Sequence, residues 1–336
     1  ALGIPAGSAV AAAGTGYLQV SLLGTFPLAA AAATAAGFKA LGEMRPALLI
    51  TVGTVVLNAV IDPLLIHGFA GVPSLGARGA AHASNFAALC AAVLSLQALR
   101  RRGISLKPCL PNWRALRRLA SIGAPMTASG LLFSAVYVGM GRIVHRYGGE
   151  GALGALGIGH RLESLAFVVC EGFAAGTATV VGQWLGRGEV KPARRAASEA
   201  ASTAAKAMLP FAALGMICPA VLVRIFVAEP AVVAASASYL RWASLVLPLL
   251  AIELVYEGAM TGAQNTWPTL LIGLFLNTAR FPAAVALAGL GLGLHGIWMA
   301  IAISSVLKGL AKWLAFRYMR LEVTVCDASN DSTCAV

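Results

Sequence analysis

The sequence predicts an all-α polytopic membrane protein made of two parallel-repeat helical bundles, with about nine transmembrane helices present of an inferred twelve. Of its 336 residues, 59% are hydrophobic and only 11% are charged, whereas globular domains are about 45–50% apolar and about 25% charged. The mean hydropathy is +0.81, and apolar stretches of about 20 residues, the length that crosses a bilayer core, recur throughout. Short motifs also recur at a nearly constant distance. These observations exclude a disordered chain and disfavour a soluble domain.

Each apolar segment is predicted to be one membrane-spanning helix, because each is close to the length that a bilayer requires. The segments cover roughly residues 17–38, 46–67, 79–99, 119–143, 152–183, 197–226, 236–260, 268–290 and 294–316. Clusters of Gly, Pro and charged residues separate them, as expected for connecting turns. These breaks fall at 42–46, 68–79, 187–189, 229–230, 264–268 and 289–293.

The loops between the segments differ in charge, and this difference predicts orientation. Alternate loops are rich in Lys and Arg, at residues 39–45, 100–118, 187–195 and 312–320. The loop at 262–267 breaks the alternation because it carries no charge. By the positive-inside rule the basic loops face the cytoplasm of a cell (plasma or inner) membrane, as does the C-terminus. The net charge of +12 therefore indicates orientation in the lipid bilayer, and we expect no nucleic-acid partner, since no basic face interleaved with aromatics occurs.

Six short matches at offsets of 217 to 222 residues reveal an internal repeat. Pro46–Ile50 (PALLI) recurs as Pro268–Ile272 (PTLLI), and Leu75–Gly79 recurs as Leu292–Gly296. Since about six segments lie within one offset, the two copies share their orientation, as in transporters with parallel halves. We expect a partial first lobe, a basic cytoplasmic linker, a complete six-helix second lobe and a polar cytoplasmic tail, over residues 1–99, 100–118, 119–318 and 319–336. The first lobe holds only its last three helices, so three more are expected upstream.

Three motifs, in order along the chain, resemble the multidrug and toxic compound extrusion (MATE) family. They are residues 57–66 (LNAVIDPLLI) with 71–81 (GVPSLGARGAA), residues 161–167 (RLESLAF) with 181–186 (VGQWLG), and residues 257–268 (EGAMTGAQNTWP). The resemblance implies export of small organic cations and amphipathic compounds by a monomer, driven by H⁺ or Na⁺ antiport through alternating access, with no cofactor besides the coupling ion. Gln264 and Asn265 depart from the family pattern, in which an acid is usual in this turn, and Val169 stands where proline is common.

Acidic residues within the spans are the main candidates for cation coupling, because a carboxylate in hydrocarbon is costly unless it serves a function. Glu253 and Glu257 lie four residues apart on one helix face,, and two neighbouring carboxylates favour a shared proton. Alternatively, Glu257 caps the helix end and Glu253 alone faces a cavity. Glu171 lies deep in its segment beside Gly172 and Gly176, a spacing that permits close helix approach.

Glu163 is a further candidate that either couples ions or forms a structural pair with Arg161, His160 or a neighbouring helix. Asn58 and Asp62, four residues apart, either bind a cation or form a polar clamp near the break at Pro63. Arg280 lies in the middle of its segment, where an acidic partner is expected, and we interpret it as structural.

Two alternatives to a drug exporter remain open at this stage. A lipid-linked precursor flippase of the same superfamily would line its cavity with Arg and Lys for phosphates. The spans here are acid-rich and base-poor, which argues against a flippase. A membrane enzyme is disfavoured, because no metal-binding triad, His cluster or nucleophile elbow occurs in the spans. We therefore expect no catalytic residues and no metal site.

Overall fold

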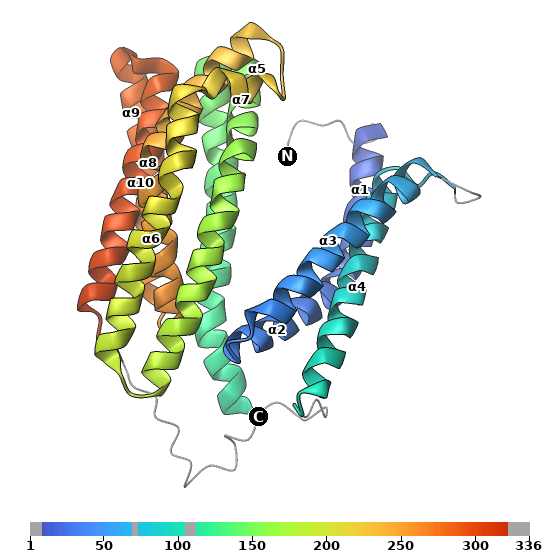
Figure 1. Ribbon diagram of the computed structural model, residues 1–336. Helices are drawn as coiled ribbons and strands as arrows, with labels where there is room; N and C mark the ends of the chain where they lie inside the picture. Colours follow the sequence, from blue (N-terminus) through green and yellow to red (C-terminus); the bar gives the residue numbers. More distant parts are fainter. Residues whose placement is uncertain (1–8, 69–72, 105–111, 322–336) are drawn as a thin grey trace. The chain divides into compact units, whose positions relative to one another are not determined.

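The computed structural model describes residues 9–68, 73–104 and 112–321, and all the regular structure in these ranges is helical (Figure 1). The described helices fall into two compact units that divide at residues 109 and 110, within the predicted basic linker. The predicted polar tail lies outside the described residues from 322 onward. The first unit contains α1 (Ala9–Leu23), α2 (Thr25–Ala40), α3 (Met44–His67) and α4 (Ala77–Arg101).

The second unit contains the remaining helices. They are α5 (Trp113–Gly186), α6 (Val190–Ile217), α7 (Pro219–Arg224), α8 (Pro230–Gly262), α9 (Trp267–Leu287), the π-helical turn η1 (Ala288–Leu292) and α10 (Gly293–Tyr318). α5 consists of two arms that fold back at Gly149, which has a φ of 69°. The edge-on contact between Tyr137 and His160 joins the two arms at nearly equal distances from this turn.

Within the described part of the chain, seven helices are long and apolar enough to cross a membrane, or eight if the bent pair α1–α2 forms one span. This confirms the polytopic helical membrane protein predicted from the sequence. Residues 267–318 form one continuous apolar stretch of 52 residues, although φ at Gly291 is 92° and breaks the helical path. The hydrogen bond from Arg280 on α9 to Ser304 on α10 shows that the chain folds back there. Dividing this span at Gly291 accounts for the predicted ninth segment.

Matching turns in the two units give the sequence repeat a structural counterpart. Gly76, before α4, has φ 53° and ψ −133°, and Gly293, at the start of α10, has φ 52° and ψ −131°. Residues other than glycine rarely adopt this positive-φ backbone conformation. Three residues later, Gly79 and Gly296 each lie so close to the backbone of the preceding helix that a Cβ atom would collide with it. Both turns therefore require glycine at the same two places.

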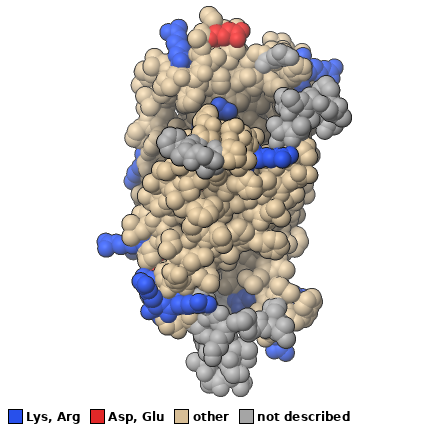
Figure 2. Space-filling view, turned by 90° about the vertical axis from the view of Figure 1, so that its right-hand side faces the viewer, with Lys and Arg blue, Asp and Glu red and all other residues tan. Residues whose placement is uncertain are grey.

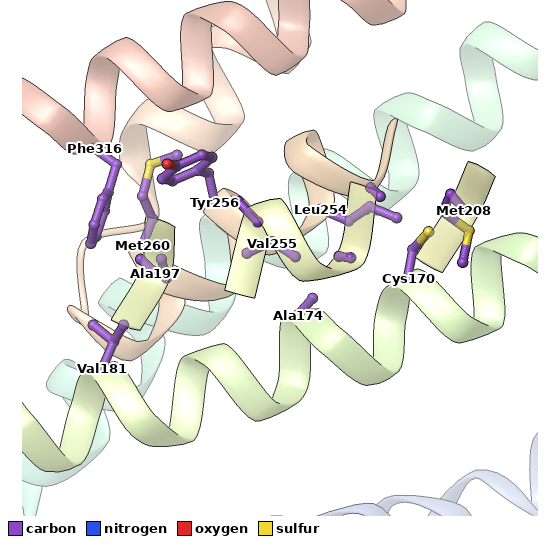
Figure 3. Close-up of a cluster of buried hydrophobic side chains, with 14 of the residues drawn as sticks. Cys170, Ala174, Val181, Ala197, Met208, Leu254, Val255, Tyr256, Met260 and Phe316 are labelled. Atoms are coloured by element: carbon purple, nitrogen blue, oxygen red, sulfur yellow. The ribbon is translucent and has the colours of Figure 1, made fainter. Parts of the chain in front are cut away.

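The core of the second unit forms where α8 packs against α5, α6 and α10. Figure 3 shows Cys170, Ala174 and Val181 of α5 facing Leu254, Val255 and Met260 of α8, with Phe316 of α10 at one end. Gly258 and Gly262 of α8 lie directly against the backbone at Ala174 and Ala178. This contact lets the two helices approach closely, as small residues do in membrane helix pairs.

Charged side chains are scarce over the middle of the surface that Figure 2 shows. Lys and Arg gather mainly toward the two ends of that view, and the broad band between them is largely uncharged. Large apolar side chains such as Leu49, Phe86, Leu165 and Phe275 are exposed on the helices. An uncharged band with exposed apolar side chains is what a lipid-facing surface requires.

Candidate functional site

A cavity of about 240 Å³ lies inside the second unit, between α5, α8, α9 and α10. Its wall is mostly apolar and aromatic, but eight polar or charged side chains reach it in two groups. The first group comes from α5 and α8, and the second from α9 and α10. The eight side chains are Tyr137, His160, Glu163, Ser164, Tyr239, Arg280, Ser305 and Lys308. Such a combination of apolar wall and few polar groups is typical of small-molecule sites.

Glu163 is the acidic group of this cavity, and neighbouring side chains hold its position. The hydroxyl of Tyr239 on α8 donates a hydrogen bond of 2.7 Å to Oε2 of Glu163. Nδ1 of His160, one helical turn earlier on α5, lies 3.8 Å from the same oxygen. The His160 ring stacks on Tyr239, with centroids 5.8 Å apart. Glu163 also lines a second, mostly apolar pocket between α5, α6, α7 and α8. It therefore forms part of the wall between this pocket and the cavity.

The basic wall of the cavity consists of Arg280 and Lys308, both more than nine-tenths buried. Nε of Arg280 donates to Oγ of Ser304 at 2.8 Å. The acidic partner expected for Arg280 is not seen: among the residues that the structure describes, no carboxylate lies within 4.0 Å of its guanidinium. Arg280 is instead anchored through a neutral serine, and it faces the cavity.

Beside the basic wall, four charged side chains join α8 to α10. The ammonium nitrogens of Lys308 and Lys312 each lie 3.0 Å from Oε1 of Glu253. Nζ of Lys312 also lies 2.5 Å from Oε2 of Glu257. We call these four residues the α8–α10 charge cluster. Two carboxylates and two ammonium groups balance, so the cluster is formally neutral.

The charge cluster corrects the prediction that the spans are base-poor. Lys312 was assigned to an inner loop, but it lies inside α10 with 3% of its surface exposed, and Lys308 is equally well buried. The spacing of these residues in the sequence could have indicated the cluster, because Lys308 and Lys312 lie four residues apart, as do Glu253 and Glu257. Two such pairs on neighbouring helices can face one another.

The structure does not place Glu171 with the other acidic candidates. Its side chain is exposed on α5 and is not part of the cavity wall described above. At the neighbouring Gly172 and Gly176, an added Cβ atom would meet no other atom within 4 Å. The close helix approach predicted there is instead made by Gly258 and Gly262 on α8.

The remaining polar candidates divide between the two units. Arg161 is exposed on α5. In the first unit, Asn58 and Asp62 lie together on α3 and face α4. The side-chain amide of Asn58 is oriented so that both its nitrogen and its oxygen form hydrogen bonds. The nitrogen donates to Oδ2 of Asp62 at 3.3 Å, and the oxygen accepts from the backbone N–H of Ser84 at 3.2 Å. Oδ1 of Asp62 is buried without a hydrogen-bond partner among the described residues.

The helical fold defines a polytopic membrane protein with a charged cavity, and similarity to known proteins identifies its family. The MatE family model matches residues 125–286. A "Probable multidrug resistance protein NorM" of Deinococcus radiodurans is 30% identical over 317 residues, which cover 90% of this chain and 68% of that protein. A protein of the same name from Thermotoga maritima is 27% identical, with 89% and 66% covered. The chain belongs to the MATE family of transporters.

The solved structures agree with this identification at the level of the fold. The crystal structure of MATE in complex with MaL6 superimposes with a TM-score of 0.86 and 23% sequence identity. The matched region covers 94% of this chain and 71% of that one. The chain thus spans about two thirds of the length of the relatives it matches.

Proposed function

We propose that this protein is a secondary active exporter of cationic or amphipathic organic compounds, which it exchanges for H⁺ or Na⁺ through alternating access. Family membership and the names of the relatives, which include multidrug resistance proteins, support export. The single observation that carries the site assignment is Glu163, a carboxylate that lines the cavity in the second unit. The basic loops support a cytoplasmic C-terminus in a plasma or inner membrane.

Glu163 is suited to couple two ligands because one negative charge serves both of them. A coupling cation and an organic cation would compete for its carboxylate, so each would displace the other. The hydrogen bond from Tyr239 holds the carboxylate in place, and Tyr137 and Phe133 add aromatic faces to the same cavity. Aromatic faces attract organic cations. Occupation of Glu163 by one ligand then favours the access state that the ligand binds better.

Glu253 and Glu257 take a supporting role in this proposal. Their charges are compensated by Lys308 and Lys312, so a further cation binds there only when an existing ion pair opens. The cluster adjoins the cavity because Lys308 belongs to both. We propose that it fixes α10 against α8 and thereby holds the basic wall of the cavity. Glu171, exposed on α5, is a separate candidate for contact with substrate.

A lipid-linked precursor flippase remains the second candidate, and one observation favours it. Arg280 and Lys308 line the cavity, and cationic side chains suit phosphate groups. Reconstituted vesicles containing a fluorescent polyprenyl-phosphate lipid would reveal this activity as accelerated loss of the fluorescence signal to a membrane-impermeant quencher. A flippase accelerates this loss, whereas an exporter of soluble compounds leaves it unchanged.

The exporter proposal is tested with the purified chain in proteoliposomes loaded with ethidium. A pH gradient and a Na⁺ gradient are imposed separately, at zero membrane potential, and ethidium movement is followed by fluorescence. We expect one of the two gradients to accelerate ethidium transport over protein-free vesicles. Equal rates in the two kinds of vesicle under both gradients would overturn the proposal.

A further inference from the structure

Arg280 is a buried cation. Among the described residues, no carboxylate forms an ion pair with it. It lies in the middle of α9 with 8% of its surface exposed. Its one hydrogen bond within the described part of the chain runs from Nε to Ser304, at 2.8 Å. The two terminal nitrogens of the guanidinium thus have no acceptor among the described residues, and Arg280 lines the cavity.

Neither nearby carboxylate forms an ion pair with this guanidinium. Oε1 of Glu253 binds the ammonium groups of Lys308 and Lys312, and Oε2 of Glu163 accepts the hydroxyl of Tyr239. The α8–α10 charge cluster is formally neutral, so it supplies no spare negative charge for Arg280. A buried charge without a paired counter-charge is strongly unfavourable. The cavity is the place where a counter-charge from outside the protein can meet this guanidinium.

We infer that Arg280 forms an anion subsite in this cavity, which takes the carboxylate of an amphipathic aromatic compound. The two terminal nitrogens of a guanidinium form a planar fork that matches the two oxygens of a carboxylate. Lys308, whose ammonium group is paired with Glu253, lines the same wall, and Ser305 adds a hydroxyl. The inference rests on the proposed function only in that it concerns the same cavity, which that proposal treats as the substrate site.

The shape and lining of the cavity define the rest of the ligand. A volume of about 240 Å³ accommodates a single aromatic ring with its acidic group. Apolar and aromatic side chains such as Phe133, Val136 and Phe167 supply the surface for the ring. Glu163 repels a second carboxylate on the opposite wall, so the ligand carries its negative charge at one end only.

Binding of benzoate and of its neutral analogue benzamide tests this subsite directly. The two compounds are titrated by calorimetry into the purified chain in uncharged-lipid nanodiscs at pH 7. We expect benzoate to bind at least about 10-fold more tightly than benzamide, because charge-assisted hydrogen bonds are about twice as strong as neutral ones.

Chloride and inorganic phosphate are titrated as competitors. If either competes more strongly than benzoate does, the site belongs to small inorganic anions, and the preference for an organic carboxylate is overturned. Competition by a short-chain polyprenyl phosphate stronger than that by benzoate would assign the subsite to a lipid phosphate and also overturn it.

Two variants assign the preference to Arg280. Arg280→Gln removes the charge, and it should bind benzoate and benzamide equally. Ser305→Asp keeps Arg280 but brings a carboxylate to the same wall, and it should also abolish the preference. Thr203→Asp adds the same charge on α6, outside this cavity, and benzoate should still be preferred there. An unchanged benzoate preference in folded Arg280→Gln or in Ser305→Asp overturns the inference.

The same preparations separate this inference from the proposed function. Ethidium transport is measured in proteoliposomes with the wild-type chain and with Arg280→Gln. Gradient-driven transport without any benzoate preference would overturn the anion subsite alone. A benzoate preference without gradient-driven transport would overturn the exporter proposal alone.

Discussion

Nζ of Lys312 lies 3.0 Å from Oε1 of Glu253, inside the helix pair formed by α8 and α10. The same nitrogen contacts Glu257 one turn further along α8. A single lysine therefore joins two carboxylates that, without it, would repel one another in a medium of low dielectric constant. This relationship explains how the chain tolerates two acids on one face of a membrane helix.

Replacing Lys312 by methionine should destabilise the protein strongly. The substitution leaves Glu257 without its ion-pair partner and Glu253 with Lys308 alone. Breaking a buried ion pair from one side costs about 3–5 kcal/mol. The loss is measured as the change in unfolding free energy in mixed micelles of dodecyl maltoside and SDS.

The control for this variant removes one charge of each sign. Glu257→Leu combined with Lys312→Met leaves Glu253 and Lys308 as a balanced pair. The double variant should be more stable than Lys312→Met alone. If the destabilisation of the double variant equals the sum of those of Lys312→Met and Glu257→Leu alone, Lys312 and Glu257 do not interact, contrary to the structure.

Alanine substitutions of glycines should have opposite effects at two positions on α5 and α8. At Gly258 a Cβ atom would collide with the backbone of Ala174, so Gly258→Ala should destabilise the protein by about 1–3 kcal/mol or more. At Gly172 nothing lies within 4 Å, so Gly172→Ala should be neutral or stabilise by up to about 1 kcal/mol. Thermal unfolding in detergent compares the two variants. A Gly172→Ala variant less stable than Gly258→Ala would contradict this packing.

Gln264 is the non-glycine residue with positive φ, 58°, among the described residues. Its side-chain oxygen accepts hydrogen bonds from Nε and Nη2 of Arg118, at 3.0 and 2.5 Å. Gln264→Ala loses these bonds and keeps the backbone strain, whereas Gln264→Gly loses the bonds and relieves the strain. The glycine variant should therefore be more stable than the alanine variant by about 1–2 kcal/mol. Equal melting temperatures for the two variants would show that the backbone there is unstrained.

The sequence allowed most of the fold to be predicted, because hydropathy, breakers and repeats act locally. The turns at Gly76 and Gly293 were identified as matching motifs, and their backbone angles agree closely. The bend at Gly24 within the first predicted span was missed. A bend of this kind depends on tertiary packing, and a single glycine in an apolar run does not specify it.

The site was predicted less completely, since charge pairing depends on which helices meet. Glu163, Glu253 and Glu257 were selected as acids within the spans, but their partners lie largely on other helices. Lys312 was missed because its position near the end of a segment resembles that of a basic loop residue. The contact of Tyr239 with Glu163 joins residues that are 76 positions apart, and no local pattern predicts such a pair.

The measurement that tests the central claim most directly is cation-coupled ethidium transport by the Glu163→Gln variant. Proteoliposomes with equal amounts of wild-type, Glu163→Gln and Glu199→Gln protein are compared under the gradient that drives the wild type. Glu199 is the matched control, because it lies on α6, paired with Arg195 and with 64% of its side chain exposed. The account predicts that Glu163→Gln loses the gradient-driven acceleration and that Glu199→Gln keeps it. Full acceleration in Glu163→Gln would contradict the account, most clearly if Glu171→Gln or Glu253→Gln abolished it instead.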